Sequence, residues 1–233
     1  MLESAVSRAV ILAAGRGTRM GAFTEEVPKP MLEVRGRPML AHILDGLRAA
    51  GLSEFLFVTG YHAEKIESYF QGADGVKFIR QKRPDGTGSA ALLAREFAAN
   101  QPFLLTYGDI LCEPAEYVRA MNVAADAVIA VKAVDDPWQG AAVYEEQGRI
   151  TRIVEKPPKG TSTTRWNSAG FYVFRPVIFD YLAELKPSPR GEYELTSALD
   201  AMLRDGLHLR ISAIEGPWRD VGRPEDLAYL NSY

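Results

Sequence analysis

Short apolar runs alternate with amphipathic helical patterns along the first half of the chain. The run at 9–14 is continuously apolar, as in a strand that is covered on both faces. Regular alternation of this kind predicts an α/β fold built on a doubly wound, mostly parallel sheet. Ligands of such sheets bind beyond the carboxyl ends of the strands. The other expected strands are 54–60, 76–81 and 103–109, and the expected helices are 38–51, 63–70 and 88–99.

The pattern changes from about residue 135. The stretch 141–157 predicts a β-hairpin that turns at Gln147-Gly148. No repeat or low-complexity segment divides the chain, so we expect one domain, 1–233, with halves 1–134 and 135–233. The second half is expected to add a lobe containing the β-hairpin. Its other expected elements are strands at 168–174 and 207–216 and helices at 176–185, 193–206 and 224–231.

Composition and charge exclude several classes of protein. A net charge of −3 over 233 residues argues against a nucleic-acid partner. The single cysteine, Cys112, cannot build a disulfide framework or a cysteine metal site within one chain, which favours a reducing cytoplasm. No uninterrupted apolar run approaches the roughly 18 residues that span a bilayer, so we expect no membrane partner.

The segment after the first apolar run has the composition of a phosphate-binding loop. Small residues, Gly15 and Gly17 among them, let a ligand approach backbone N–H groups that can face phosphate oxygens. Arg19 and Lys29, the latter between two prolines, add cations beside the same strand end. A Walker loop is excluded because no Gly-Lys-Ser/Thr follows, and Met20 replaces the third glycine of a dinucleotide fingerprint. The loop therefore indicates a polyphosphate ligand.

Three motifs in order resemble the sugar-1-phosphate nucleotidylyltransferases, also called NDP-sugar pyrophosphorylases. The motifs are LAAGRGTRM (12–20), VPKPM (27–31) and VRGRPML (34–40). The later RGEYELTSALDAML…GPWRDVGRPEDL is similar to glucose-1-phosphate thymidylyl- and uridylyltransferases. The resemblance implies a Rossmann-like fold of the nucleotide-diphospho-sugar transferase type. It implies a nucleotide site formed by Leu12, Ala13, Ala14, Gly15, Gly17, Thr18, Arg19, Lys29, Gln81, Gly86, Thr87 and Gly88.

The same resemblance implies roles for residues in the rest of the chain. Asp109 in YGDI and Asp220 in WRDVG match the two magnesium-binding carboxylates of the family. Arg19, Lys29 and Lys156 become the candidate catalytic residues, because they would hold and neutralise the reacting phosphates. The residues implied for the sugar phosphate are Gly140, Glu155, Lys156, Asn167 and Gly170.

These features predict an enzyme that transfers a nucleoside monophosphate from a nucleoside triphosphate to a sugar-1-phosphate, with Mg²⁺ as cofactor. UTP or dTTP is favoured as the donor. One alternative is a cytidylyl- or guanylyltransferase that acts on phosphocholine, mannose-1-phosphate or heptose-1-phosphate. Another is a non-catalytic regulatory subunit on the same fold. No left-handed β-helix repeats follow, so we expect the catalytic unit alone, as a monomer or a homo-oligomer.

Overall fold

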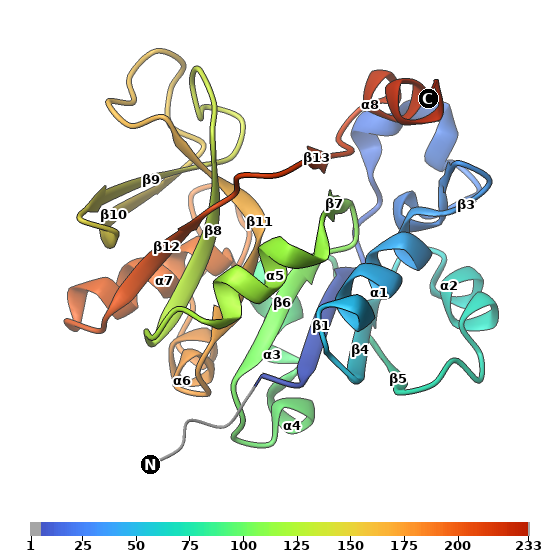
Figure 1. Cartoon of the computed structure of the whole chain (residues 1–233), viewed down its shortest axis with the longest axis horizontal. Helices are drawn as coiled ribbons and strands as arrows, with labels where there is room; N and C mark the ends of the chain where they lie inside the picture. Colours follow the sequence, from blue (N-terminus) through green and yellow to red (C-terminus); the bar gives the residue numbers. More distant parts are fainter. Residues whose placement is uncertain (1–5, 233) are drawn as a thin grey trace.

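The structure is a computed structural model that describes residues 6–232, so the ends of the expected domain, 1–5 and 233, lie outside the described residues. The strands of its main sheet are β1 Arg8–Ala13, β4 Glu54–Thr59, β5 Val76–Arg80, β6 Phe103–Tyr107, β8 Ala127–Ala133, β9 Ala141–Glu146, β10 Arg149–Glu155, β11 Trp166–Phe174 and β12 Leu209–Ala213. Within the described part of the chain these nine strands follow the order β5-β4-β1-β6-β11-β8-β12-β10-β9 (Figure 1).

Most strands of the main sheet run in one direction. β5, β4, β1 and β6 are mutually parallel, as the alternation of strands and helices predicts. β11 then runs antiparallel to both β6 and β8, and β12 is parallel to β8. β10 pairs antiparallel with β12 and with β9, so only β10 and β11 run against the rest of this sheet. The mostly parallel α/β fold is confirmed, and the added lobe grows from the same sheet, because β11 lies between two strands of the first half.

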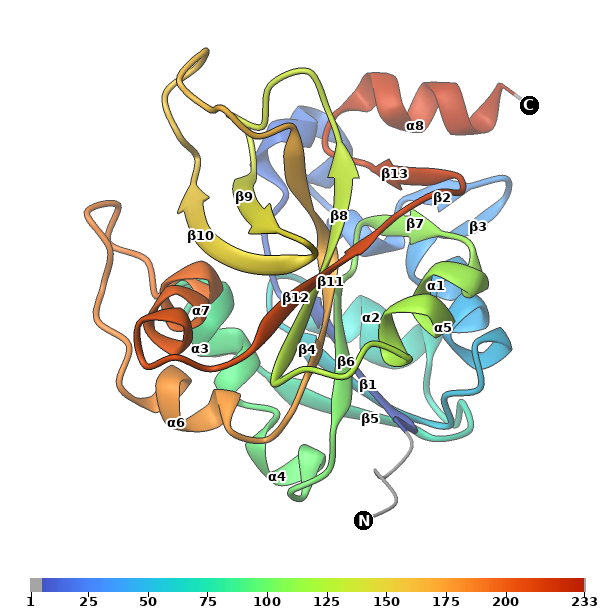
Figure 2. The same ribbon diagram turned by 60° about the vertical axis from the view of Figure 1, so that its left-hand side comes forward.

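Helices cover both faces of the main sheet (Figures 1 and 2). One face carries α1, α2 and α5, and the other carries α3, α4, α6 and α7, whereas α8 lies beyond the ends of the strands beside β2. A hydrophobic core lies on each face of the sheet. Along β1, Ile11 packs into the core beneath α1 and Val10 into the core beneath α3, which explains why this run is apolar at every position. The helices are α1 Met39–Ala49, α2 Ala63–Tyr69, α3 Thr87–Leu92, α4 Arg95–Ala98, α5 Pro114–Met121, α6 Ile178–Ala183, α7 Leu195–Arg204 and α8 Pro224–Asn231.

The hairpin is confirmed, whereas several short elements were not predicted. Gln147 and Gly148 both have positive φ, 52° and 78°, the backbone that a two-residue hairpin turn requires. The helix expected at 88–99 is divided into α3 and α4. Other elements that were not predicted are α5, β8, the 3₁₀ helices Thr18–Thr24 and Lys29–Met31, and the short strands β2 Glu33–Val34, β3 Arg37–Pro38, β7 Ile110–Cys112 and β13 Trp218–Asp220.

Among residues 6–232, no helix combines the length and the apolar character needed to cross a membrane.

Gly170→Ala is expected to lower the free energy of unfolding by about 1–3 kcal/mol. Gly170 has φ +81°, and a Cβ there would lie 2.7 Å from Cγ1 of Ile110. Gly15→Ala is the matched control, because a Cβ at Gly15 meets nothing within 4 Å. Urea denaturation of both variants measures the difference, and equal stability of the two would contradict the strain argument.

Candidate active site

Two adjoining cavities open beyond the carboxyl ends of the parallel strands. The smaller has a volume of about 370 Å³ and is lined by the loop after β1 and by residues that follow β5. The larger has a volume of about 630 Å³ and is lined by the loop before β9, by β11 and by the segment around β13. Two ligands bound in these cavities would meet at the residues that line both, which are Arg19, Thr87, Tyr107, Asp109 and Glu192.

The smaller cavity brings together almost every residue implied for nucleotide binding. The backbone N–H groups of Gly15, Arg16 and Gly17 donate no hydrogen bond within residues 6–232, so they are available to an anion. Gly88 differs from the prediction, because it is buried and lines neither cavity; its N–H donates to the Tyr193 carbonyl at 2.7 Å. The implied residues that do line the cavity are Leu12, Ala13, Ala14, Gly15, Gly17, Thr18, Arg19, Lys29, Gln81, Gly86 and Thr87.

Gly17 makes room for a buried lysine. Its φ is +65°, and a Cβ would lie 2.8 Å from Cβ of Lys29. Lys29 is only 7% exposed, and its ammonium pairs with the Asp109 carboxylate. A cation buried against one carboxylate is held in a fixed position, here in the smaller cavity beside Asp109, which lines both cavities.

Asp109 and Asp220 come from distant parts of the sequence and lie close together through a short two-stranded ladder. β7 pairs antiparallel with β13, which places Asp220 opposite Ile110, the residue after Asp109. The Val221 N–H donates to the Asp109 carbonyl at 3.0 Å. Oδ1 of each aspartate is buried and has no hydrogen-bond partner within the described part of the chain. Such orphaned carboxylate oxygens indicate a missing cationic or donor partner.

The electrostatics of this pair fit a divalent cation. Burial, and next the Asp109 carboxylate, raise the pKa of Asp220 to about 6, although Lys29 and Arg19 oppose the change. Oxygen ligands with unsatisfied charge are what Mg²⁺ prefers, with the other positions taken by substrate oxygens and water. Residues 6–232 contain no group of three or more His, Cys, Asp or Glu side chains suited to a metal, so the chain would supply two carboxylates at most.

Asp220 is expected to make the metal-free protein less stable as the pH rises from about 4 to about 6. The folded state raises this carboxyl pKa from 3.8 to about 6, so it binds more protons than the unfolded state between these values. Asp220→Asn removes that loss and should melt at a higher temperature than the wild type at pH 7.5, but not at pH 4. Thermal melts with a chelator present measure this, and a variant that is equally less stable at both pH values would contradict it.

The larger cavity contains every residue implied for the sugar phosphate. The backbone N–H of Lys156 donates to the Gly140 carbonyl at 2.7 Å, which ties the end of β10 to the loop before β9. A Cβ at Gly140 would collide with the Asn167 carboxamide, whose Oδ1 is buried without a hydrogen-bond partner among the described residues. The five implied residues that line this cavity are Gly140, Glu155, Lys156, Asn167 and Gly170.

Three further lining residues were given no role by sequence reasoning. The guanidinium of Arg190 lies 2.9 Å from Glu194 and 3.4 Å from Glu155. Thr196 lines the same cavity, and its Oγ1 is buried without a partner within residues 6–232. All three lie in the stretch RGEYELT (190–196), whose charged residues at every second position could have marked it as part of a polar site.

Fold and site together define an α/β protein in which a glycine-rich loop with free backbone N–H groups lines one of two adjoining cavities. The family model for nucleotidyl transferases matches residues 8–233, and the chain belongs to this family. The resemblance to the sugar-1-phosphate nucleotidylyltransferases is therefore confirmed.

Individual relatives agree with this membership. The bifunctional protein GlmU of Methanococcus aeolicus is 37% identical over 226 residues, which cover 97% of this chain and 54% of the relative. The chain thus spans about half the length of that relative. The UTP–glucose-1-phosphate uridylyltransferase AglF of Haloferax volcanii is 37% identical over 230 residues, covering 94% of this chain and 93% of the relative. A crystal structure of UDP-glucose pyrophosphorylase complexed with UDP-glucose shares the fold, with a TM-score of 0.89 at 23% identity over 97% of both chains.

Proposed function

We propose that the chain transfers a nucleoside monophosphate from a nucleoside triphosphate, UTP or dTTP, to a sugar-1-phosphate. The observation that carries this proposal is the position of Asp109 and Asp220. Their unpartnered oxygens lie close together, and Asp109 lines both cavities. A reaction that joins two phosphorylated substrates needs charged groups of this kind at the place where the two cavities meet. The names of the similar proteins, which include UTP, glucose-1-phosphate and UDP-glucose, support the same pairing.

The chemistry is an in-line displacement at phosphorus. An oxygen of the sugar phosphate attacks the α-phosphorus, a new P–O bond forms, and the bond to the β-phosphate breaks to release pyrophosphate. The attacking oxygen is already anionic at neutral pH, so no general base is needed. This agrees with the absence of histidine from the described lining of both cavities. Arg19 and Lys29 would neutralise the leaving pyrophosphate, and positioning would supply much of the remaining acceleration.

Asp109 and Asp220 would hold Mg²⁺ in this proposal. Bound there, the ion would neutralise phosphate charge and orient the triphosphate. The fit rests on the two orphaned carboxylate oxygens and on the raised pKa of Asp220.

Lys156→Ala is expected to raise KM for the sugar-1-phosphate by about 10- to 100-fold and KM for the triphosphate by less than about 3-fold. Lys156 lines only the larger cavity, where it would pair with the sugar phosphate. Lys159→Ala is the matched control, because Lys159 lines neither cavity and lies 5.7 Å from the Trp138 ring. Initial rates measured while each substrate is varied give both KM values. Equal increases in the two KM values would contradict the assignment of Lys156 to the sugar phosphate.

Pyrophosphate release in a substrate grid tests the proposed function. UTP, dTTP, CTP, GTP and ATP are each combined with glucose-, N-acetylglucosamine- and mannose-1-phosphate and with phosphocholine, in the presence of Mg²⁺. Release that depends on both UTP or dTTP and a sugar-1-phosphate is expected. Release only with CTP or GTP would favour the alternative transferases. Triphosphate binding without release in any combination would favour a regulatory subunit.

The same proposal includes the organisation of the chain. Residues 1–134 would form the nucleotide-binding half and 135–233 the sugar-phosphate-binding half of one catalytic domain. We also propose a cytoplasmic enzyme, on the argument from its single cysteine.

A further inference from the structure

A third cavity lies at the opposite end of β10 from the candidate active site. It has a volume of about 630 Å³ and shares no lining residue with the two cavities described above. Its wall is formed by the turn of the β9–β10 hairpin, the end of α7 and the start of β12, which pack together (Figures 1 and 2). A cavity of this size can hold a small organic molecule.

Two arginines that line this cavity stand opposite each other on neighbouring strands. Arg149 of β10 and Arg210 of β12 are direct partners in the antiparallel ladder. Partners of this kind project from the same face of the sheet, with Cβ atoms about 4.5–5.5 Å apart. Like charges in these positions repel each other, so the pair opposes the pairing of β10 with β12 unless an anion lies between the two guanidinium groups.

The protein supplies no partner for either guanidinium. Among residues 6–232, the side chains of Arg149 and Arg210 form no hydrogen bond and no ion pair. Nε of Arg210 is buried without an acceptor, and Nη2 would lie 3.0 Å from a Cβ placed on Gly148 in the hairpin turn. Within the described lining Glu146 is the only carboxylate, and it pairs with neither arginine. The cavity therefore keeps a net positive charge.

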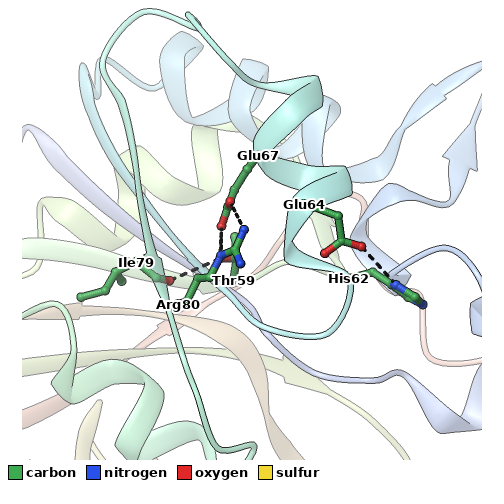
Figure 3. Close-up of polar contacts among 6 residues, drawn as sticks. All are labelled: Thr59, His62, Glu64, Glu67, Ile79 and Arg80. Atoms are coloured by element: carbon green, nitrogen blue, oxygen red, sulfur yellow. Dashed lines mark hydrogen bonds and ion pairs between the residues drawn. The ribbon is translucent and has the colours of Figure 1, made fainter.

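The arginine at the end of β5 shows how the same fold compensates such a charge. Arg80 donates from Nε to the Glu67 carboxylate at 2.8 Å and from Nη2 to its second oxygen (Figure 3). The hydrogen bonds from Arg80 hold the pKa of Glu67 below its usual value, so this pair is ionised at neutral pH. Arg149 and Arg210 carry the same forked donor without a bonded carboxylate in the described part of the chain. An anion from solution can satisfy both forks.

The donors around the cavity fit a phosphate group better than a carboxylate. Each guanidinium fork can hold two oxygens, and a phosphate monoester offers three oxygens and nearly two negative charges. His208 lies two residues before Arg210 and lines the same cavity, so its ring can donate to a further oxygen. Ile150, Leu203 and Leu207 add an apolar wall, against which the organic part of an ester can pack.

We propose that this cavity is a second anion site, which binds the phosphate group of a small phosphorylated metabolite between Arg149 and Arg210. The site is separate from the candidate active site, because β10 begins with Arg149 and ends with Glu155, roughly 20 Å away at the rise of an extended strand. A bound phosphate removes the repulsion between the two arginines and stabilises the pairing of β10 with β12. The inference does not rest on the proposed function.

Chemical-shift mapping by NMR tests the site directly, and it separates this cavity from the candidate active site, which also contains phosphate-binding groups. Phenyl phosphate is titrated into the full chain at constant ionic strength. The backbone amide signals of Gly148 and Ile211 should shift along one saturable binding curve, while Gly15 and Gly17 report on the smaller cavity. Signals of Gly148 and Ile211 that do not respond, or that drift without saturation, would overturn the proposal.

Arg210→Met should weaken phenyl phosphate binding at this site at least about 10-fold. Methionine retains much of the volume of the arginine stem and removes the charged fork. Arg152→Met is the matched control, because Arg152 lies on the same strand as Arg149 but packs 3.9 Å from the centre of the Tyr144 ring and does not line the cavity. Equal losses in the two variants would overturn the proposal, because they would show a response to overall charge alone.

Thermal melts of Arg210→Met in a buffer without phosphate or sulfate test whether the arginine serves the fold instead. The variant should melt no lower than the wild type, because it removes both the repulsion with Arg149 and a buried donor without an acceptor. A clearly lower melting temperature would overturn the proposal, because it would show that Arg210 stabilises the protein without an anion.

Inorganic phosphate and benzoate separate the features of the ligand. Inorganic phosphate should bind about 3- to 10-fold more weakly than phenyl phosphate, because it lacks an apolar part to pack beside Leu203 and Leu207. Benzoate should bind more weakly still, because it has two oxygens and one charge. Inorganic phosphate that binds as tightly as phenyl phosphate would overturn the assignment of an organic ligand, and benzoate that does so would overturn the assignment of a phosphate.

Discussion

Asp109→Asn is expected to lower the turnover number for pyrophosphate release by roughly 10²–10³ or more. The substitution keeps the shape of the side chain and removes its charge. It leaves Lys29 without its carboxylate partner and the boundary of the two cavities without one of two facing anions. Initial rates at saturating Mg²⁺ and both substrates measure the effect. Near wild-type turnover would show that Asp109 takes no part in the reaction.

The matched control for this prediction is Asp45→Asn. Asp45 is half exposed and pairs with Arg37 at 2.8 Å on the surface, away from both cavities. Surface pairs contribute about 0–1 kcal/mol, so this variant should retain both turnover and melting temperature. A loss in Asp109→Asn that is matched by Asp45→Asn would indicate a general effect of charge.

Lys29→Met is expected to lower turnover by a similar factor, about 10²–10³. Methionine has a volume similar to that of the lysine stem, so packing beside Gly17 is retained. The lost ammonium would leave the Asp109 carboxylate unpaired and the leaving pyrophosphate less neutralised. Lys29 also lowers the pKa of Asp220, so the acidic limb of the pH–rate profile should shift to higher pH. A pH–rate profile of the variant measures both effects, and an unchanged limb would contradict this assignment.

A double variant separates stability from catalysis at the same site. Removing one partner of a buried pair is destabilising because an uncompensated charge remains. Lys29→Met combined with Asp109→Asn should therefore recover part of the melting temperature lost in Lys29→Met, but none of the turnover. Recovery of turnover would show that the charges act only on folding. Lys65→Met is the surface control, because Lys65 is exposed and lines neither cavity.

The parts of the fold that were predicted from sequence have strong local signals. The continuous apolar run of β1 reflects burial on both faces, and Gln147-Gly148 supplies the positive φ values of the hairpin turn. β7 and β13 carry no such signal, because three residues are too few to show a period. Their pairing nevertheless brings Asp220 beside Asp109. The geometry of the site therefore depends on two strands that could not be predicted from the sequence.

The candidate site shows the same division between residue type and arrangement. The family motifs assigned Gln81, Gly86 and Gly88 to one nucleotide-binding segment. Only the structure shows that Gly88 packs beneath Tyr193 and Leu185 rather than lining the cavity. The orientation of the Gln81 amide likewise depends on side-chain contacts that no spacing rule encodes.

The most direct test of the central claim follows isotopic label in two parallel reactions with UTP, a sugar-1-phosphate and Mg²⁺. One uses label on the α-phosphorus and the other uses label on the γ-phosphorus. The account predicts that the α label enters a sugar nucleotide and that the γ label enters pyrophosphate. A γ label that appears on the sugar, or in inorganic phosphate without any labelled sugar nucleotide, would contradict attack at the α-phosphorus.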